Sequence, residues 1–457
     1  MRPPYQLTAH PIGSLREIWA VSWPLMLSLS STSLMTFADR LFLAHYSVAA
    51  MNAVTCASAF CFVLIAFPLT VCEITGVFVG RYHGQDENAK IGKPVWQMLW
   101  LALLTWPLFM TLSRLVSPLL FDSGSYEETY FITSLDFGPL QLASFALMGF
   151  FLGIGKTKII TLSTILANLL NAILAPLFIF GTPLTPALGV KGAAIATASA
   201  MGFQALFLLF LLLRKHNREK YQTAPCRIQP SLIKEMLRLG VPAGIGRTAE
   251  SVAHSLFFRI IAMAGAIELT SATIAQSFYM LVVFCVYGIS KAMTAIISNL
   301  VGANALSHIP KAIKSAFKIH TVLFLFLLAF SLAGSELILS KTLNVEDSHL
   351  LDSPEFLMTV KTTMFFMSLF FLLKGFSWIL VGHLTALGDT KFIMYVNGFT
   401  HWVGYILPIY FLVSFFGAGA IIGWTIIAFN ALIVASIFWY RSTRKREALV
   451  ANFQSTQ

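Results

Sequence analysis

Long apolar runs separated by short polar loops dominate the pattern of hydrophobic and polar positions along the chain. A helix that crosses the hydrocarbon core of a bilayer needs about 20 apolar residues. Twelve segments reach that length, and the pattern therefore predicts an all-α polytopic membrane protein with twelve transmembrane helices. The predicted spans are 17–44, 50–80, 95–119, 130–153, 158–181 and 189–213, followed by 239–264, 270–300, 316–340, 357–386, 391–415 and 418–440.

Charges in the loops alternate in sign along the chain. Cytoplasmic loops hold the excess of Lys and Arg, so the basic loops and both termini are predicted to be cytoplasmic, in an inner or plasma membrane. Two cytoplasmic termini require an even number of spans, which agrees with twelve. The basic loops contain Arg81, Lys90, Lys93, Lys156, Lys158, Arg214, Lys215, Arg218, Lys311, Lys314, Arg441 and Arg444, and the acidic loops contain Asp122, Glu127, Glu128, Glu346, Asp347, Asp352 and Glu355.

The longest polar connector, residues 214–234, divides the chain into two similar halves. Pro24 recurs as Pro242, and Gly80 recurs as Gly302. Six spans return a chain to its starting side of the membrane, so the repeat is parallel, a known transporter design. We predict two pseudo-symmetric six-helix bundles with a cleft between them. The predicted units are an N-terminal lobe (1–213), a cytoplasmic linker (214–234), a C-terminal lobe (235–441) and a cytoplasmic tail (442–457).

Composition supports the membrane class and excludes several others. The chain is 57% hydrophobic and 11% charged, whereas a typical soluble domain has about 25% charged residues. The net charge of +11 would indicate nucleic acid in a soluble protein, but membrane topology explains basic residues that lie in loops, and no nucleic-acid partner is predicted. No Walker-type phosphate loop, HExxH motif or cysteine framework is present. We therefore expect no ATP-driven pump, no enzyme and no cofactor.

Asp39 is the most informative single residue of the chain. It lies near the end of the first span, where Arg40 is the only other charge between residues 21 and 44. A carboxylate at membrane depth usually faces protein or water and marks an ion, proton or substrate path. The functional interpretation places Asp39 in a water-filled cavity, with Thr36, Thr32 and Ser28 on the same face. The alternative is that Arg40 extends to the interface and Asp39 only balances its charge.

Two asparagines of the first lobe have alternative interpretations. Asn168 and Asn171 lie inside the fifth span, and amides there need partners. They either hold helices together, or Asn171 supplies an oxygen to a site shared with Asp39.

Pro24 and Pro242 open corresponding spans, where proline removes a backbone donor. They are either static kinks or hinges.

The seventh span carries ionisable residues on one helical face, at spacings of three and four residues. Three such residues on a buried stripe indicate a site, unless the arginine and the glutamate simply pair. Lys374 in the tenth span needs an anion, and Glu250 is the nearest candidate. The residues of the stripe are Arg247, Glu250 and His254. Two other lone charges, Glu73 in the second span and Lys291 in the eighth, are interpreted as structural ion pairs or as charges at the cytoplasmic end.

Several motifs, taken in this order and at these spacings, resemble the multidrug and toxic compound extrusion (MATE) transporters over nearly the whole chain. The resemblance implies two six-helix lobes around a central cavity and efflux of organic cations, drugs or other amphipathic molecules, driven by inward H⁺ or Na⁺ flow. The motifs are Pro24 followed by Ala38-Asp39-Arg40-Leu41-Phe42, Val79-Gly80-Arg81-Tyr82-His83-Gly84, Gly153-Ile154-Gly155-Lys156-Thr157-Lys158, Leu188-Gly189-Val190-Lys191-Gly192 and Gly240-Val241-Pro242 with Glu250 eight residues later.

The resemblance also implies roles for individual residues. Asp39 matches the acidic residue of the first helix that is proposed to couple transport to the cation. Asn171 matches its amide partner in the fifth helix, and Thr197 matches a hydroxyl in the sixth. Glu250 matches the glutamate of the seventh helix in the second lobe. The implied protein is a monomer in the lipid bilayer, with Na⁺ at Asp39 and Asn171 as the one candidate metal site.

Two positions depart from the pattern of the resembled family. Ala175 stands where many relatives carry Asp or Asn, and Lys374 stands where sodium-coupled relatives carry an acidic residue. A lysine ammonium there can take the place of the cation and pair with Glu250. This substitution favours protons at Asp39 over sodium as the coupling ion.

Two other functions remain open at the level of sequence. One is flipping of a lipid-linked precursor, as in the flippases that resemble this family distantly. A wide, strongly cationic central groove would favour that function, and the Asp39–Asn171 pattern speaks against it. The other is a passive channel or a membrane scaffold without transport activity.

Overall fold

The computed structural model describes residues 5–183, 186–333 and 354–454, and in this part of the chain the regular elements are helices. The first half contains α1 (Leu15–Tyr46), α2 (Val48–Glu73), α3 (Thr75–Gly84), α4 (Gly92–Leu120), α5 (Tyr126–Asp136), α6 (Gly138–Gly153), α7 (Thr157–Phe180) and α8 (Gly189–Leu212). The second half contains α10 (Pro230–Ile261), α11 (Ala266–Gly302), α12 (Ile309–Ala333), α14 (Pro354–Ala386), α15 (Thr390–His401), α16 (Leu407–Phe416) and α17 (Ala420–Gln454).

Each of the twelve predicted spans coincides with one helix or with a broken pair, so the predicted fold class is confirmed. The span predicted at 50–80 is α2 and α3, which meet at Ile74, and the span at 130–153 is α5 and α6, bent by 42°. The span at 391–415 is α15 and α16, joined by a π-helical turn at Trp402–Ile406. Residues 334–340 of the ninth span and the acidic residues Glu346, Asp347 and Asp352 lie outside the described residues.

Helices run across two of the predicted unit boundaries, and the predicted linker is partly helical. The linker contains a short helix, α9 (Lys215–Tyr221), and α10 begins at Pro230, before the predicted end of the linker at 234. Proline fits the first position of a helix, where its missing N–H has no intrahelical partner. The last helix continues into the predicted tail as far as Gln454.

Local sequence explains where several helices start. The Ser14 hydroxyl accepts a hydrogen bond from the backbone N–H of Glu17, and the Glu17 carboxylate accepts one from Gly13 N–H at 2.6 Å. Ser125 and Glu128 repeat this pattern at α5, with Gly124 N–H as the donor. Such reciprocal capping satisfies backbone donors that a helix leaves without intrahelical partners.

Hydropathy separates two helices from the other spans. Among the described residues, nine helices are long and apolar enough to cross a membrane, and the bent pair α5–α6 makes a tenth. The two remaining predicted spans are α1 and α10, which are more polar. These two helices carry Asp39 and the Arg247–Glu250–His254 stripe, so polarity is concentrated where a site was expected.

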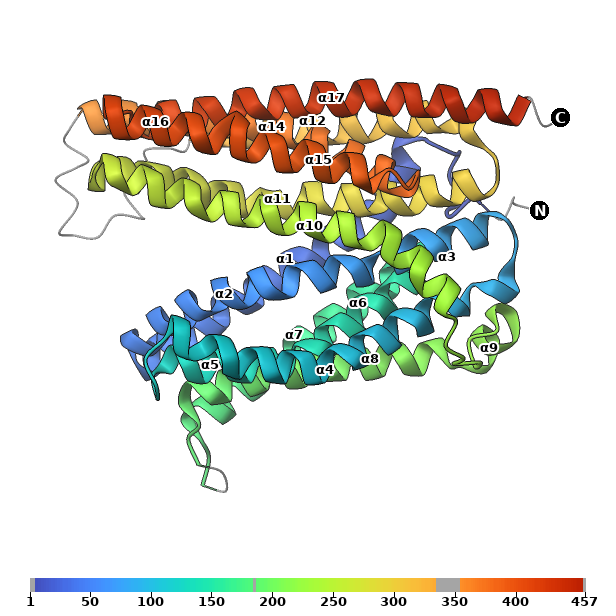
Figure 1. The fold of residues 1–457 in the computed structure, drawn as a ribbon, viewed down its shortest axis with the longest axis horizontal. Coiled ribbons are helices and arrows are strands. Elements are labelled where there is room, and N and C mark those ends of the chain that lie inside the picture. The colour runs from blue at the N-terminus through green and yellow to red at the C-terminus, as the bar shows by residue number, and fades with distance from the viewer. Residues whose placement is uncertain (1–4, 184–185, 334–353, 455–457) are drawn as a thin grey trace.

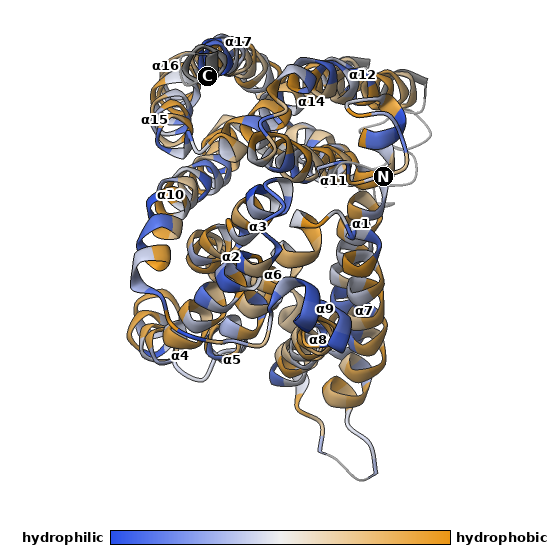
Figure 2. Cartoon of the chain, turned by 90° about the vertical axis from the view of Figure 1, so that its right-hand side faces the viewer, coloured by the Kyte–Doolittle hydropathy of each residue, from blue (hydrophilic) through white to orange (hydrophobic). Residues whose placement is uncertain are grey.

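The two halves of the chain form two helical groups that lie side by side (Figure 1). They meet where α1, α2 and α3 of the first lobe pack against α10 and α11 of the second. Both termini lie at the same end of the molecule, here called the terminal end. Viewed from that end, α9 is hydrophilic, while outer helices such as α4 and α7 are largely apolar (Figure 2).

The lobes share a hydrophobic core near the terminal end. This core combines Val79 and Phe151 of the first half with Ile297 and Ala386 of the second. A separate core lies wholly within the second lobe, around Trp424. The lobes therefore share a core near the terminal end, and α10 adds a second contact, because Met236 packs in a core of the first lobe.

Hydrogen bonds between the lobes reinforce the terminal end. Arg81 Nη2 donates to Ala386 O at 2.8 Å, and the His83 ring and the Asn299 amide oxygen are 2.7 Å apart. Asn299 Nδ2 also donates to Gly153 O at 2.8 Å. Buried backbone and amide groups need such partners, because an unpaired polar group away from water costs free energy.

Glycines allow α3 and α11 to cross closely. A Cβ atom on Gly302 would collide with the backbone carbonyl oxygen of Arg81, and one on Gly84 would collide with the backbone of Asn299. The obstacle in both cases is backbone, which cannot rotate away as a side chain can. Gly302, one of the two glycines that recur in the sequence repeat, thus allows the backbones of the two lobes to approach closely.

We expect Gly302→Ala to lower the melting temperature of the purified protein by several degrees, because the new methyl group forces α3 and α11 apart. Gly398→Ala is the matched control, since its added methyl group meets no atom within 4 Å and alanine favours a helix over glycine by up to about 1 kcal/mol. Thermal unfolding in detergent measures both. An unchanged or raised melting temperature for Gly302→Ala would show that the crossing is looser than described.

Candidate functional site

Two adjoining cavities lie between the lobes. The first has a volume of about 170 Å³ and is lined from both halves of the chain, by residues such as Leu25, Glu73 and Phe145 on one side and Arg247 and Lys291 on the other. The second has a volume of about 520 Å³ and extends into the second lobe. They share the residues Leu29, Thr70, Phe145, Arg247, Glu250, Tyr287 and Trp378.

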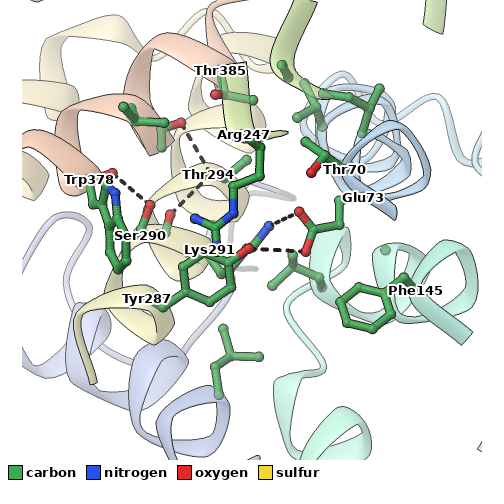
Figure 3. Close-up of a pocket in the computed structure, with 18 of the residues that line it drawn as sticks. Thr70, Glu73, Phe145, Arg247, Tyr287, Ser290, Lys291, Thr294, Trp378 and Thr385 are labelled. Atoms are coloured by element: carbon green, nitrogen blue, oxygen red, sulfur yellow. Dashed lines mark hydrogen bonds and ion pairs between the residues drawn. The ribbon is translucent and has the colours of Figure 1, made fainter. Parts of the chain in front are cut away.

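Glu73 and Lys291 form an ion pair across the lobe interface (Figure 3). Glu73 is the last residue of α2, directly before the break at Ile74, and Lys291 lies on α11. The Tyr287 hydroxyl also donates to Glu73 Oε1, at 3.4 Å. The prediction of a structural ion pair is confirmed, with the additional finding that the pair lines the first cavity and connects the lobes.

Arg247 reaches from α10 into the same cavity (Figure 3). Its guanidinium carbon lies 5.1 Å from the ring centroid of Tyr287 and 5.7 Å from that of Trp378. Ring faces attract cations at such distances through their quadrupole. The aromatic residues, rather than a carboxylate, are therefore the immediate neighbours of this charge.

Glu250 pairs with Lys374, as the sequence suggested, at an Nζ–Oε1 distance of 2.7 Å. The alternative pairing of Glu250 with Arg247 is not the one observed. Lys374 also lies 3.4 Å from His401 Nε2, and His401 Nδ1 lies 2.6 Å from Asn397 O. A carbonyl oxygen only accepts, so Nδ1 carries the ring proton and Nε2 accepts from the ammonium. The result is a chain of hydrogen bonds from Glu250 through Lys374 to His401.

The four predicted members of the second-lobe charge cluster come together as expected. Arg247, Glu250, His254 and Lys374 all line the larger cavity. Within the described part of the chain, His254 Nε2 is buried and has no hydrogen-bond partner. The cluster therefore contains a hydrogen-bonded chain from Glu250 to His401 and one ring nitrogen, His254 Nε2, without a partner among the described residues.

Asp39 lies inside the first lobe. It does not line either of the two cavities between the lobes. Instead it is partly buried inside the first lobe, beside α7 and α8. Arg40 is exposed. Asp39 lines neither of these two cavities and bonds within its own lobe, so a position facing water stays a prediction for this carboxylate.

Asn171 and Thr197 are the partners of Asp39, as the family resemblance implied. With the Asn171 amide oriented to satisfy its neighbours, its Nδ2 donates to Asp39 Oδ1 at 2.8 Å. Its Oδ1 then accepts from the Thr197 hydroxyl at 3.1 Å and from the Thr197 N–H at 3.2 Å. Asn171 thus faces Asp39 as a hydrogen-bond donor and not as a second oxygen ligand. A role in cation coupling stays a prediction for these three residues.

Other polar residues of the first lobe serve helix packing. Asn168 donates to the Ser31 hydroxyl at 2.7 Å, which joins α7 to α1 and agrees with the packing alternative. Thr32 and Thr36 donate to carbonyls one turn back in their own helix. Ser28 donates to Thr164 at 2.9 Å. Of the three residues expected on the same face as Asp39, Ser28 is the one that lines the first cavity.

The two prolines lie within unbroken helices. Pro24 is inside α1 and Pro242 is inside α10, and both are buried. The carbonyl of Pro24 accepts a hydrogen bond from the Thr161 hydroxyl at 2.5 Å. A hinge role for Pro24 and Pro242 stays a prediction.

Sequence reasoning missed several cavity residues. His401 is an ionisable residue in a predicted span, a signal that could have marked it. Tyr287 and Trp378 gave no such signal, because aromatic residues in an apolar run usually pack in the core. In the described part of the chain, no three His, Cys, Asp or Glu side chains are placed to hold a metal ion together.

Comparison with known proteins identifies the family. The MatE family model matches residues 24–177 and 242–411, which is most of the chain and both halves of the repeat. This protein belongs to the MatE family. The resemblance drawn from the sequence motifs is thereby confirmed.

Relatives of the MatE chain include two proteins named "Probable multidrug resistance protein NorM". The one from Thermotoga maritima is 26% identical over 313 residues, which covers 66% of each chain. The one from Photorhabdus laumondii is 24% identical over 413 residues and 88% of each chain. A third, from Agrobacterium fabrum, is matched over 57% of its length. The alignments with the first and third relatives therefore span less than two thirds of their lengths.

Solved structures share the fold. One, described as the outward-facing conformation of a multidrug resistance MATE family transporter of the MOP superfamily, aligns with a TM-score of 0.83 and 19% identity over 98% of this chain and 99% of that one. Another, of MATE in the straight conformation, aligns with a TM-score of 0.84 and 19% identity over 99% of both chains. The two-lobed helical bundle is thus common to all three proteins.

We expect Glu250→Gln and Lys374→Met each to destabilise the protein, because either change leaves one buried charge without its partner, a cost of about 3–5 kcal/mol. The double variant should lose less than the sum of the two, since it leaves neither charge behind. Thermal unfolding of the three variants in detergent measures this coupling. Lys90→Gln, at an exposed pair with Glu87, is the control and should change stability much less. Additive effects of the two cavity substitutions would contradict the pairing.

Proposed function

We propose that this MatE protein is a secondary antiporter that exports amphipathic small molecules in exchange for an inward-moving cation. The observation that carries this proposal is the larger cavity between the lobes, about 520 Å³ in volume and lined by apolar, aromatic and charged residues. Small-molecule sites typically have volumes of about 300–1,000 Å³ and a few polar groups in a mostly apolar wall. The names of the NorM relatives and the MATE transporter structures support drug efflux as the activity.

The arrangement of the lobes supports alternating access as the mechanism. The lobes share a core and hydrogen bonds at the terminal end, while the cavities lie between them farther along. Noncovalent contacts of this kind can break as a group when one lobe rocks against the other. In this proposal the terminal end, where the basic loops lie, is cytoplasmic, and the cavity is closed to the cytoplasm in the conformation described.

Asp39 is the proposed coupling residue of the antiporter. A proton on its carboxyl group, or a cation beside it, would change the hydrogen bond that it accepts from Asn171 and so the packing of α1 against α7 and α8. The same α1 helix contributes Leu25 and Ser28 to the first cavity and contacts α11 of the other lobe. Binding of a cation at Asp39 can therefore shift the equilibrium between the two arrangements of the lobes, provided that the cation binds more tightly to one arrangement than to the other.

The coupling ion is proposed to be H⁺ rather than Na⁺. In the second lobe the Lys374 ammonium already lies against the Glu250 carboxylate, so a sodium ion would have to compete with a tethered cation there. In the first lobe the Asn171 amide turns its N–H toward Asp39, an arrangement that suits a carboxylate without a bound metal. The protein would work as a monomer in the plasma membrane, without a cofactor and without enzymatic chemistry.

We expect Asp39→Asn to abolish gradient-driven export while leaving the fold intact, because asparagine is nearly isosteric and cannot take up a proton. Efflux of ethidium, a cation, and 8-anilinonaphthalene-1-sulfonate, an anion, is measured from proteoliposomes under a proton gradient and, separately, under a sodium gradient. Asp122→Asn, in an exposed loop, is the matched control and should export at the wild-type rate. Wild-type export by Asp39→Asn would refute the coupling role.

The same vesicles separate the antiporter from the two alternative functions. A passive channel would release dye without responding to an imposed ion gradient, whereas an antiporter shows counter-flow. A flippase would move a fluorescent lipid between leaflets and leave both dyes inside. A proton gradient that drives export where a sodium gradient does not would select H⁺ as the coupling ion.

A further inference from the structure

The charges around the two cavities do not balance. Their walls contain three basic side chains, those of Arg247, Lys291 and Lys374, but only two carboxylates, those of Glu73 and Glu250. Lys291 pairs with Glu73, and Lys374 pairs with Glu250. The excess positive charge is therefore located at Arg247, which borders both cavities.

The Arg247 guanidinium lies near two aromatic rings and its donors are unused. Tyr287 and Trp378 lie 5.1 and 5.7 Å from its central carbon. Within the described ranges, no hydrogen bond or ion pair engages this side chain. The rings stabilise the positive charge, but they supply no oxygen acceptor for its N–H groups. That planar edge carries five donors and matches the two oxygens of a carboxylate, sulfonate or phosphate.

The neighbouring carboxylates do not repel an anion at Arg247 as bare charges would. Glu250 lies three residues along the same helix but is neutralised by the Lys374 ammonium at 2.7 Å. Glu73 is neutralised by Lys291 and accepts from the Tyr287 hydroxyl. An anion at either lysine would lie beside a carboxylate that is already paired there, and the two negative groups would repel each other. Arg247 can bind an anion without that direct repulsion.

The walls around Arg247 suit an apolar body attached to that anion. Phe145 is common to both cavities, and the larger one adds Phe62, Phe284 and Phe370. Aromatic side chains provide large apolar contact areas and stack on other rings. A molecule with an anionic group at Arg247 could therefore extend its aromatic part into the 520 Å³ cavity.

We propose that Arg247 binds the anionic group of the transported molecule, so that the substrates of this antiporter are amphipathic organic anions with an aromatic body. This substrate class replaces the organic cations expected from the family resemblance. The proposal rests on the proposed function for transport, but binding at Arg247 does not depend on transport and can be tested separately.

Two probes with the same ring and opposite charge test the site, naphthalene-1-acetate and 1-naphthylmethylammonium. Binding to the purified full-length protein in neutral detergent is followed by quenching of tryptophan fluorescence. We expect the wild type to bind the anion at least about tenfold more tightly than the cation. Arg247→Gln should weaken anion binding about ten- to a hundredfold, the range for a hydrogen-bonded charged contact, and should leave cation binding unchanged or improved.

Two further variants keep the outcome clear if Arg247→Gln is poorly folded. Arg247→Lys keeps the charge but loses the planar edge, so it should bind the anion with intermediate affinity. Arg114→Gln removes the same charge at a position that lines neither cavity, and it should bind both probes as the wild type does. Preference for the cationic probe in the wild type, or unchanged anion binding in Arg247→Gln, would overturn the proposal.

The results distinguish this inference from the proposed function. Anion binding that depends on Arg247, in a protein that exports neither dye, would support the site and reject the antiporter. Export of ethidium but not of the anionic dye, with no effect of Arg247→Gln on probe binding, would reject the site and leave the antiporter standing. Repeating the binding in nanodiscs with and without phosphatidylglycerol shows the source of the anion, because displacement of the probe would assign the site to a lipid headgroup.

Discussion

The burial of charged side chains between the two lobes is the constraint on which the site depends. A charge removed from water needs a partner of opposite sign, because its desolvation costs several kcal/mol. Glu73 finds that partner across the interface in Lys291, and Glu250 finds it in Lys374. The first pair ties the lobes together, while the second keeps the wall of the larger cavity neutral. Arg247 is stabilised by ring faces instead, which leaves its donors available.

The fold separates the proposed coupling residue from the cavity. Asp39 is held inside the first lobe by Asn171, and the charged cavity residues are mostly on α10, α11 and α14 of the second. A link between them has to run through helix packing, and α1 is the element that touches both regions. This separation suits an exchanger, because cation and substrate can then bind in different places and compete through the conformation of the lobes.

The division between polar and apolar helices follows from the same physics. Helices that face lipid have no water to satisfy polar side chains, so α4, α7 and α8 are strongly apolar. The more polar α1 and α10 carry Asp39 and the Arg247–Glu250–His254 stripe, whose charges have protein partners or face a cavity. Close glycine contacts between α3 and α11 then bring the lobes near enough for Glu73 to meet Lys291.

The sequence by itself determined the number of spans, the parallel repeat and the family, because span length and hydropathy are local properties that the bilayer imposes on each helix separately. It also predicted the Glu250–Lys374 pair, since two intramembrane charges of opposite sign need each other. Only the tertiary structure decided which way each side chain faces. Asp39 points into its own lobe, His401 joins Lys374, and Tyr287 and Trp378 flank Arg247. Those contacts join residues far apart in the chain, and they depend on how helices rotate and cross when the lobes pack together.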